Sequence, residues 1–117
     1  KQDLLFFAAA DCTGHGVPGA LVSVVCSNAL NRTLLEFNIT DTGKILDKTR
    51  ELVIATFEKS EKDVKDGMDI SLCCLNKKTN VLYWSGANNP LWFLCSRPGE
   101  EITMQEIKGD KQPIGKY

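Results

Sequence analysis

Apolar residues along this chain follow different spacings, which predict a strand, two helices and then further strands. Residues 3–10 begin with an unbroken apolar run and end in three alanines, a pattern that predicts a buried strand. Residues 18–36 predict a helix whose first half is apolar nearly all round, so we expect it to be buried. Residues 42–59 predict an amphipathic helix, because their apolar positions share one face at a 3.6-residue spacing.

Strand patterns follow the second helix. Residues 69–75 and 80–86 flank a polar turn at 76–79, which predicts a hairpin. Residues 91–96 and 102–107 predict two more strands. One strand, two helices and an antiparallel meander in this order favour an α+β layered fold, with the two helices side by side on an antiparallel sheet.

Polar residues at the junctions predict how several elements begin and end. Asp41 or Thr42 is the candidate N-cap of the second helix. Asn80 tolerates a left-handed backbone in the hairpin turn. Asn88, which is followed by a second asparagine and Pro90, predicts another tight turn.

The composition is that of an ordinary globular domain. Hydrophobic residues make up 43% of the chain and charged residues 25%, which argues against disorder. A formal net charge of −1 provides no basic field, so we expect neither nucleic acid nor an anionic membrane as a partner. Polar residues interrupt the longest apolar stretch, 17–35, so no membrane insertion is expected. The first three residues lead directly into the strand pattern, so no signal peptide is expected.

Five cysteines indicate the redox environment. Their odd number, without any Cys-x-x-Cys pair, argues against a disulfide framework. Cys73 and Cys74 are adjacent in a predicted strand, so their side chains should point to opposite faces. We therefore expect reduced, mostly buried thiols in a cytoplasmic protein.

Candidate chemistry is concentrated in residues 10–20, where a strand leads through a glycine-rich turn into a helix. Asp11 ends the strand, so its carboxylate should face out of the sheet on a rigid support. Such oxygen ligands suit hard cations like Mg²⁺ or Mn²⁺, and glycines let the backbone approach a ligand. An Asp in this place is also a common turn cap, so both interpretations stay open.

Three other kinds of site do not fit the spacing. The glycines lack the Gly-x-x-x-x-Gly-Lys-Ser/Thr pattern of a phosphate loop. Cys12 and His15 stand three residues apart in one loop, which is not the usual arrangement of a thiol nucleophile and its base. A tetrahedral zinc site needs more His or Cys ligands than a chain with one His offers at suitable spacing.

Four segments, in the same order, resemble the metal-dependent protein serine/threonine phosphatases related to sporulation stage II protein E and the bacterial sigma-regulator phosphatases. Residues 11–20 (DCTGHGVPGA) resemble the signature of that family. Residues 66–73 (DGMDISLC), 86–92 (GANNPLW) and 108–115 (KGDKQPIG) resemble its later strand, turn and loop segments. Together these segments extend over nearly the whole chain.

The resemblance implies a protein phosphatase 2C-like fold, an α-β-β-α sandwich of two stacked antiparallel sheets with helices outside. It implies hydrolysis of phosphoserine or phosphothreonine on a protein, assisted by two Mn²⁺ or Mg²⁺ ions. By position, Asp11 is implied as a metal ligand, with the backbone carbonyl of Cys12 as its companion. For His15 the resemblance suggests a general acid, which its reference pKa near neutrality allows; a turn-stabilising role is the default interpretation.

Other acidic metal ligands of the family lie in a hairpin upstream and in segments downstream. We therefore expect residues 1–117 to be the central part of a single phosphatase domain that lacks the N-terminal hairpin and the C-terminal metal-ligand segments. The implied function is dephosphorylation of a regulatory protein in bacterial signalling, with anti-sigma antagonist proteins as typical substrates. The alternative is a non-catalytic interaction module that keeps the fold without a complete metal site.

Other polar and aromatic residues have simpler default interpretations. Asp69 precedes an apolar strand and is expected to stabilise a turn, with a place in the active site as the alternative. Asp110 is expected in a solvated ion pair with a neighbouring lysine. Trp84 and Trp92 are expected to be packing residues.

With Asp11 as the one family side-chain ligand present, we predict that this chain alone binds Mn²⁺ or Mg²⁺ weakly. Calorimetric titration of the isolated chain measures this affinity. Tight binding of two ions would mean that the ligands are misassigned.

Overall fold

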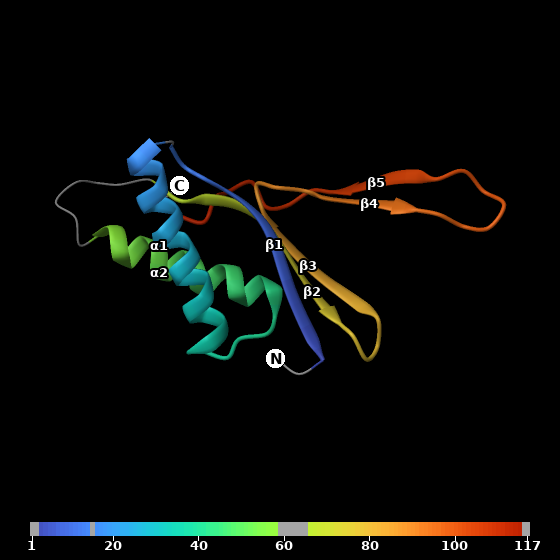
Figure 1. The fold of residues 1–117 in the computed structure, drawn as a ribbon, viewed down its shortest axis with the longest axis horizontal. Helices are drawn as coiled ribbons and strands as arrows, with labels where there is room; N and C mark the ends of the chain where they lie inside the picture. Colours follow the sequence, from blue (N-terminus) through green and yellow to red (C-terminus); the bar gives the residue numbers. More distant parts are fainter. Residues whose placement is uncertain (1–2, 15, 59–65, 116–117) are drawn as a thin grey trace.

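A strand, a helix pair and a set of strands follow one another in the computed structural model (Figure 1), which describes residues 3–14, 16–58 and 66–115. The predicted order of elements is confirmed. In the described residues the elements are β1 (Leu4–Cys12), α1 (Gly16–Leu35), α2 (Thr42–Glu58), β2 (Met68–Asn76), β3 (Val81–Ala87), β4 (Leu91–Cys95) and β5 (Thr103–Ile107).

β1 extends two residues beyond the predicted strand. Asp11 pairs with Asp69 and Cys12 pairs with Met68, so both belong to the sheet and not to the following loop. The apolar run could not show this, because pairing with a distant strand decides where a strand ends.

The first sheet is antiparallel, with the order β1-β2-β3 and β2 in the centre. β4 and β5 form a separate two-stranded sheet, so the predicted continuous meander is wrong between β3 and β4. After β3 the chain turns at Asn88, whose φ is 60°, and Pro90 has no N–H to continue a ladder. Instead, Ala87 makes a bridge to Asp110 in the segment that follows β5.

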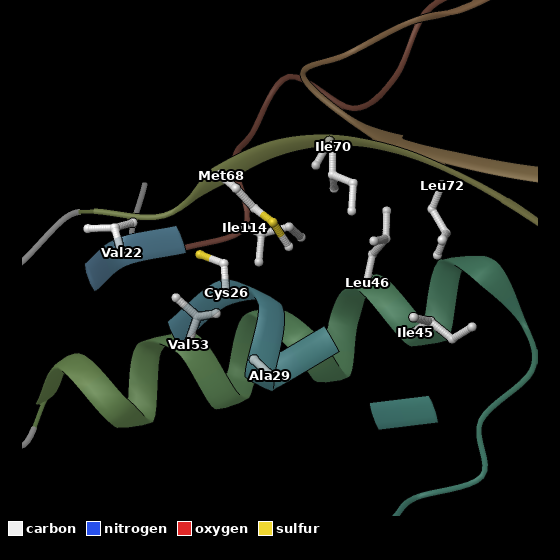
Figure 2. Packing of buried hydrophobic residues seen from close by; sticks show 11 residues of the cluster. Val22, Cys26, Ala29, Ile45, Leu46, Val53, Met68, Ile70, Leu72 and Ile114 are labelled. Carbon is white, nitrogen blue, oxygen red and sulfur yellow. The ribbon is translucent and has the colours of Figure 1, made fainter. Parts of the chain in front are cut away.

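Both helices cover one face of the three-stranded sheet, as predicted. The core lies between the helices and the sheet (Figure 2). Met68, Ile70 and Leu72 project from β2 toward the helices. The members of this core are Val22, Cys26, Ala29, Ile45, Leu46, Val53, Met68, Ile70, Leu72, Ala87 and Ile114. Because β2 supplies core residues at every second position, its intervening residues face away from the helices.

A buried hydroxyl pair joins the two helices. The side-chain oxygens of Thr33 on α1 and Thr49 on α2 are 3.2 Å apart. A hydroxyl has a single proton, so one of the two donates across the helix pair and the other donates to the backbone carbonyl four residues earlier, which is Ala29 for Thr33 and Ile45 for Thr49. These bonds satisfy both polar groups in the core, so the hydroxyls hold the helices in one register without an unpaired atom.

Two segments predicted to be buried are partly exposed. On β1, Leu5 and Phe7 are 48% and 50% exposed. On α1, Val17 and Leu21 are 75% and 64% exposed, because the buried residues of this helix form a single stripe. Within residues 3–14, 16–58 and 66–115, nothing packs on the outer face of the sheet or on the far side of α1 to cover these side chains.

The β4–β5 hairpin extends away from the helices and lengthens the molecule to 59 Å (Figure 1). Trp92 on this hairpin is 63% exposed and its Nε1 donates to Glu106 Oε2 at 2.6 Å, so its predicted packing role is wrong for the described residues. Trp84 on β3 is half-buried and its Nε1 donates to Ser71 Oγ at 2.7 Å.

The predicted helix cap and hairpin turn are confirmed. Asp41 is the N-cap of α2, since its Oδ1 accepts from the backbone N of Lys44 at 3.0 Å. Asn80 has a φ of 58°, the left-handed conformation expected of it. The five cysteines are free thiols, and no described helix is long and apolar enough to cross a membrane.

Gly67 occupies a place that no side chain can share. A Cβ there would overlap the backbone carbonyl of Ile114, which forms hydrogen bonds with Met68 next to it. We predict that Gly67→Ala lowers the free energy of unfolding of the intact protein by about 1–3 kcal/mol, measured by urea denaturation.

The matched control for this change is Gly43→Ala on the first turn of α2. A Cβ there would come no closer than 3.4 Å to another atom, and alanine favours a helix. Its effect should be neutral or stabilising by up to about 1 kcal/mol. Equal losses in both variants would contradict the steric explanation.

Burial raises the pKa of the Cys26 thiol from 9.0 to about 12, and the neighbouring Cys12 adds to the rise. The folded state therefore keeps a proton that the unfolded state loses above about pH 9, so stability present below pH 9 is lost as pH rises toward 12. We predict that the unfolding free energy falls between pH 8 and pH 10.5, and falls less in Cys26→Ala. Urea denaturation at pH 8 and at pH 10.5 measures the unfolding free energy of both proteins. An equal fall in the wild type and in Cys26→Ala would contradict the assignment of this pH dependence to Cys26.

Candidate metal centre

Three chain segments meet at one end of the three-stranded sheet. β1 ends at Asp11 and Cys12, β2 begins at Met68 and Asp69, and Asn88 directly follows β3. Asp11 and Asp69 are direct partners in the β1–β2 register, and Asn88 makes a bridge to Ile70. The tertiary fold thus gathers two carboxylates and an amide that are far apart in the sequence.

Both carboxylates lie on the sheet face that points away from the helices. Met68 and Ile70 project toward the helices (Figure 2), so Asp69 between them projects to the other side. Residues directly opposite each other in an antiparallel pair share a face, so Asp11 joins Asp69 there. The prediction that the Asp11 side chain faces out of the core agrees with this position, and Asp11 is exposed.

Hydrogen bonding next to Asp11 fixes the direction of the Cys12 carbonyl. The backbone N of Thr13 donates to the carbonyl of Gly67 at 2.9 Å, so Thr13 and Gly67 form a hydrogen-bonded pair. Such pairs alternate along an antiparallel ladder, which makes Cys12 and Met68 a non-hydrogen-bonded pair. The carbonyl of Cys12 therefore points away from β2, across the edge of β1 that no described strand occupies.

The turn after β1 is held on two sides. Gly67 N donates to Thr13 Oγ1 at 3.0 Å, which ties the turn to the start of β2. On the other side, a Cβ on Gly19 of α1 would stand 2.8 Å from the carbonyl carbon of Gly14, whose φ is 85°. Glycine at both positions allows the helix to begin directly against the turn, which fixes the backbone beside Asp11.

Asn88 connects the end of β3 to Asp69. Its Nδ2 donates to Asp69 Oδ1 at 3.0 Å, and its backbone N donates to the carbonyl of Asp110 at 2.7 Å. Asp69 was predicted by default to stabilise a turn; the hydrogen bond is consistent with that, but the residue also stands opposite Asp11. Asp110 makes no ion pair with either neighbouring lysine in the part of the chain that the structure describes.

Asp11, Asp69 and the Cys12 carbonyl offer oxygen donors, the chemistry that Mg²⁺ and Mn²⁺ prefer. No cluster of three or more Asp, Glu, His or Cys side chains that could hold a metal occurs among the described residues. The donors therefore fit part of a metal site, since Mg²⁺ takes about six ligands. His15 lies outside the described residues, so its suggested general-acid role stays a prediction.

A cavity of about 320 Å³ lies between α2, β3 and the segment after β5. Arg50 and Lys108 line it together with Asp47 and Asp110, so its charges balance. The Nε of Arg50 is buried there without a hydrogen-bond partner. Because neither Asp11 nor Asp69 lines this cavity, it is separate from the carboxylate pair.

Comparison with solved structures finds the same architecture in two other proteins. The SiaA-PP2C domain of Pseudomonas aeruginosa superposes with a TM-score of 0.77 at 28% identity, over 98% of this chain and 43% of that chain. A stage II sporulation E family protein from Thermanaerovibrio acidaminovorans superposes with a TM-score of 0.65 at 13% identity, over 88% of this chain and 48% of that chain.

The present chain thus spans less than half the length of both solved structures, and its fold is α+β of the protein phosphatase 2C type. None of the curated proteins matches its sequence. Residues 1–116 match the family described as stage II sporulation protein E, which is nearly the whole chain. The chain therefore belongs to the stage II sporulation protein E family.

Proposed function

We propose that this chain is the central part of the catalytic domain of a metal-dependent phosphatase that acts on phosphoserine or phosphothreonine. One observation carries the proposal: Asp11, the last residue but one of β1, lies on the sheet face that points away from the helices, and the adjacent Cys12 carbonyl points across the edge of β1 that no described strand occupies. This is an oxygen-donor pair on a rigid strand, beside a turn that matches the signature expected of the family.

The residues of this chain would bind the cation and leave room for a substrate. Asp11 would supply a negatively charged ligand, and the Cys12 carbonyl a neutral one. When bound, a pair of Mn²⁺ or Mg²⁺ ions supplies an activated water and neutralises charge on the phosphoryl group. Because the face that carries Asp11 is exposed, a phosphorylated side chain of another protein can approach it.

The remaining metal ligands in this proposal belong to the part of the domain that the chain does not include. The chain corresponds to 43% and 48% of the two solved structures, which leaves more than half of such a domain for them. On its own, the chain is accordingly proposed to be inactive.

The proposed substrate is a phosphorylated regulatory protein in bacterial signalling, of the anti-sigma antagonist kind. A net charge of −1 gives the chain no basic field that would favour nucleic acid instead. Five free thiols support a reducing compartment, so the cytoplasm is part of the proposal.

A non-catalytic interaction module is the second candidate, favoured by the absence of a three-ligand cluster among the described residues. The sequence of the intact protein separates the two. Acidic residues in a hairpin before β1 and in an Asp-Gly segment after residue 117 are expected for the enzyme, and their absence is expected for the module.

We predict that Asp11→Asn abolishes phosphatase activity of the intact protein without unfolding it. Asparagine is nearly isosteric with aspartate and keeps its hydrogen-bonding capacity, but it loses the negative charge that holds a cation against water. Turnover of a phosphoserine protein at saturating Mn²⁺, together with a thermal melt, measures both effects.

Asp3→Asn is the matched control, because Asp3 precedes the other end of β1 and makes an exposed ion pair with Lys78. This variant should keep normal turnover. If Asp11 only caps a turn, Asp11→Asn should instead retain near-normal turnover with a stability loss of up to about 1 kcal/mol.

A further inference from the structure

We propose that Asp69 is a second carboxylate that this chain contributes to the metal centre, and that Asn88 positions it. This inference deepens the proposed metal-dependent function and rests on it. It concerns a residue for which the sequence favours a role in a turn, with a place in the active site as the alternative.

The β1–β2 register gives Asp69 the required place. Asp11 and Asp69 form a hydrogen-bonded antiparallel pair, two residues from the Thr13–Gly67 pair. Cα atoms of such pairs are about 5.5 Å apart, and both side chains stand on the same face. A cation bound to the Asp11 carboxylate on this face is therefore within reach of the Asp69 carboxylate.

Asn88 restricts the orientation of the Asp69 carboxylate. Its Nδ2 donates to Oδ1 of Asp69, and its own backbone is held by the carbonyl of Asp110 and by a left-handed φ of 60°. A carboxylate has two oxygens and about four acceptor positions, so this one hydrogen bond leaves acceptor capacity for a cation. Orientation of a ligand by a fixed hydrogen-bond donor is common around bound metals.

Electrostatics favours a cation between the two carboxylates. Like charges directly opposite each other on neighbouring strands destabilise a sheet. Across the described residues, neither Asp11 nor Asp69 forms an ion pair with a lysine or arginine. A divalent cation shared by the pair would convert their repulsion into attraction. A role confined to the turn would require only an acceptor for Asn88, which an amide also provides.

The test uses Asp69→Asn in the intact protein, because asparagine keeps an acceptor for the Asn88 amide and removes only the charge. Mn²⁺ binding is measured by calorimetry, and the melting temperature is measured in EDTA and in Mn²⁺. We expect Mn²⁺ affinity to fall by about tenfold or more. The melting temperature in EDTA should stay equal or rise, while the Mn²⁺-induced rise becomes smaller.

Two further variants sharpen the result. Asn88→Gly keeps the left-handed backbone and removes the amide donor, so Mn²⁺ affinity should fall in the same direction but by less than in Asp69→Asn. Asp110→Asn is the control for loss of a nearby charge, since Asp110 is exposed and contacts Asn88 through its backbone. Its Mn²⁺ affinity should match that of the wild type.

The outcomes separate this inference from the function on which it rests. If the wild type binds Mn²⁺, Asp11→Asn loses it and Asp69→Asn keeps full affinity, then the inference is overturned while the metal-dependent function stands. If Asp110→Asn lowers Mn²⁺ affinity as much as Asp69→Asn does, the inference is also overturned. The loss of affinity would then follow from removing any nearby negative charge. If the wild type binds no Mn²⁺, both the metal-dependent function and the inference fail.

Discussion

The antiparallel register of β1 against β2 is the constraint on which the rest of the structure depends. It sets Asp11 opposite Asp69 and Cys12 opposite Met68. A slip of one residue would move every side chain of β1 to the other face of the sheet, placing Asp11 against the helices and the core-facing Cys12 outside. The same register decides which carbonyls point away from β2, and so offers the carbonyl of Cys12 at the open edge. Gly67 and Thr13 hold this register, at the end of the sheet that carries Asp11 and Asp69, through hydrogen bonds in both directions.

The helix pair packs on one side of the sheet, and the other side carries Asp11 and Asp69. Core residues of β2 alternate with Asp69 and Ser71, so packing against α1 and α2 orients the polar positions outward without any further contact. The buried hydroxyls of Thr33 and Thr49 fix the two helices to each other. Apolar residues such as Leu5 and Phe7 lie on the same sheet face as the carboxylates, further along β1. The site is thus at the polar end of a largely apolar surface.

The segments on either side of the β4–β5 hairpin connect it to the same end of the sheet. Asn88 before the hairpin and Asp110 after it share a backbone hydrogen bond, and Asp110 also donates to the carbonyl of Gly86. These bonds close the base of the hairpin against β3, directly beside the residue that contacts Asp69. Two hydrogen bonds through Asn88 therefore connect the base of the hairpin to Asp69.

The sequence by itself determined the order and type of the elements, because helical and strand spacings differ and the Asp41 cap and the Asn80 turn are local features. It also made Asp11 a candidate metal ligand, through the glycine-rich turn that follows it and the resemblance of residues 11–20 to the family signature. It could not determine that β1 extends to Cys12, that β3 and β4 do not pair, or that Leu5, Val17 and Leu21 are exposed. Each of these features depends on which residues, distant in the sequence, pack against an apolar side chain or pair with a backbone amide. Only the tertiary structure placed Asp69 and Asn88 beside Asp11, because strand register brings together residues that stand 58 and 77 positions beyond Asp11 in the sequence.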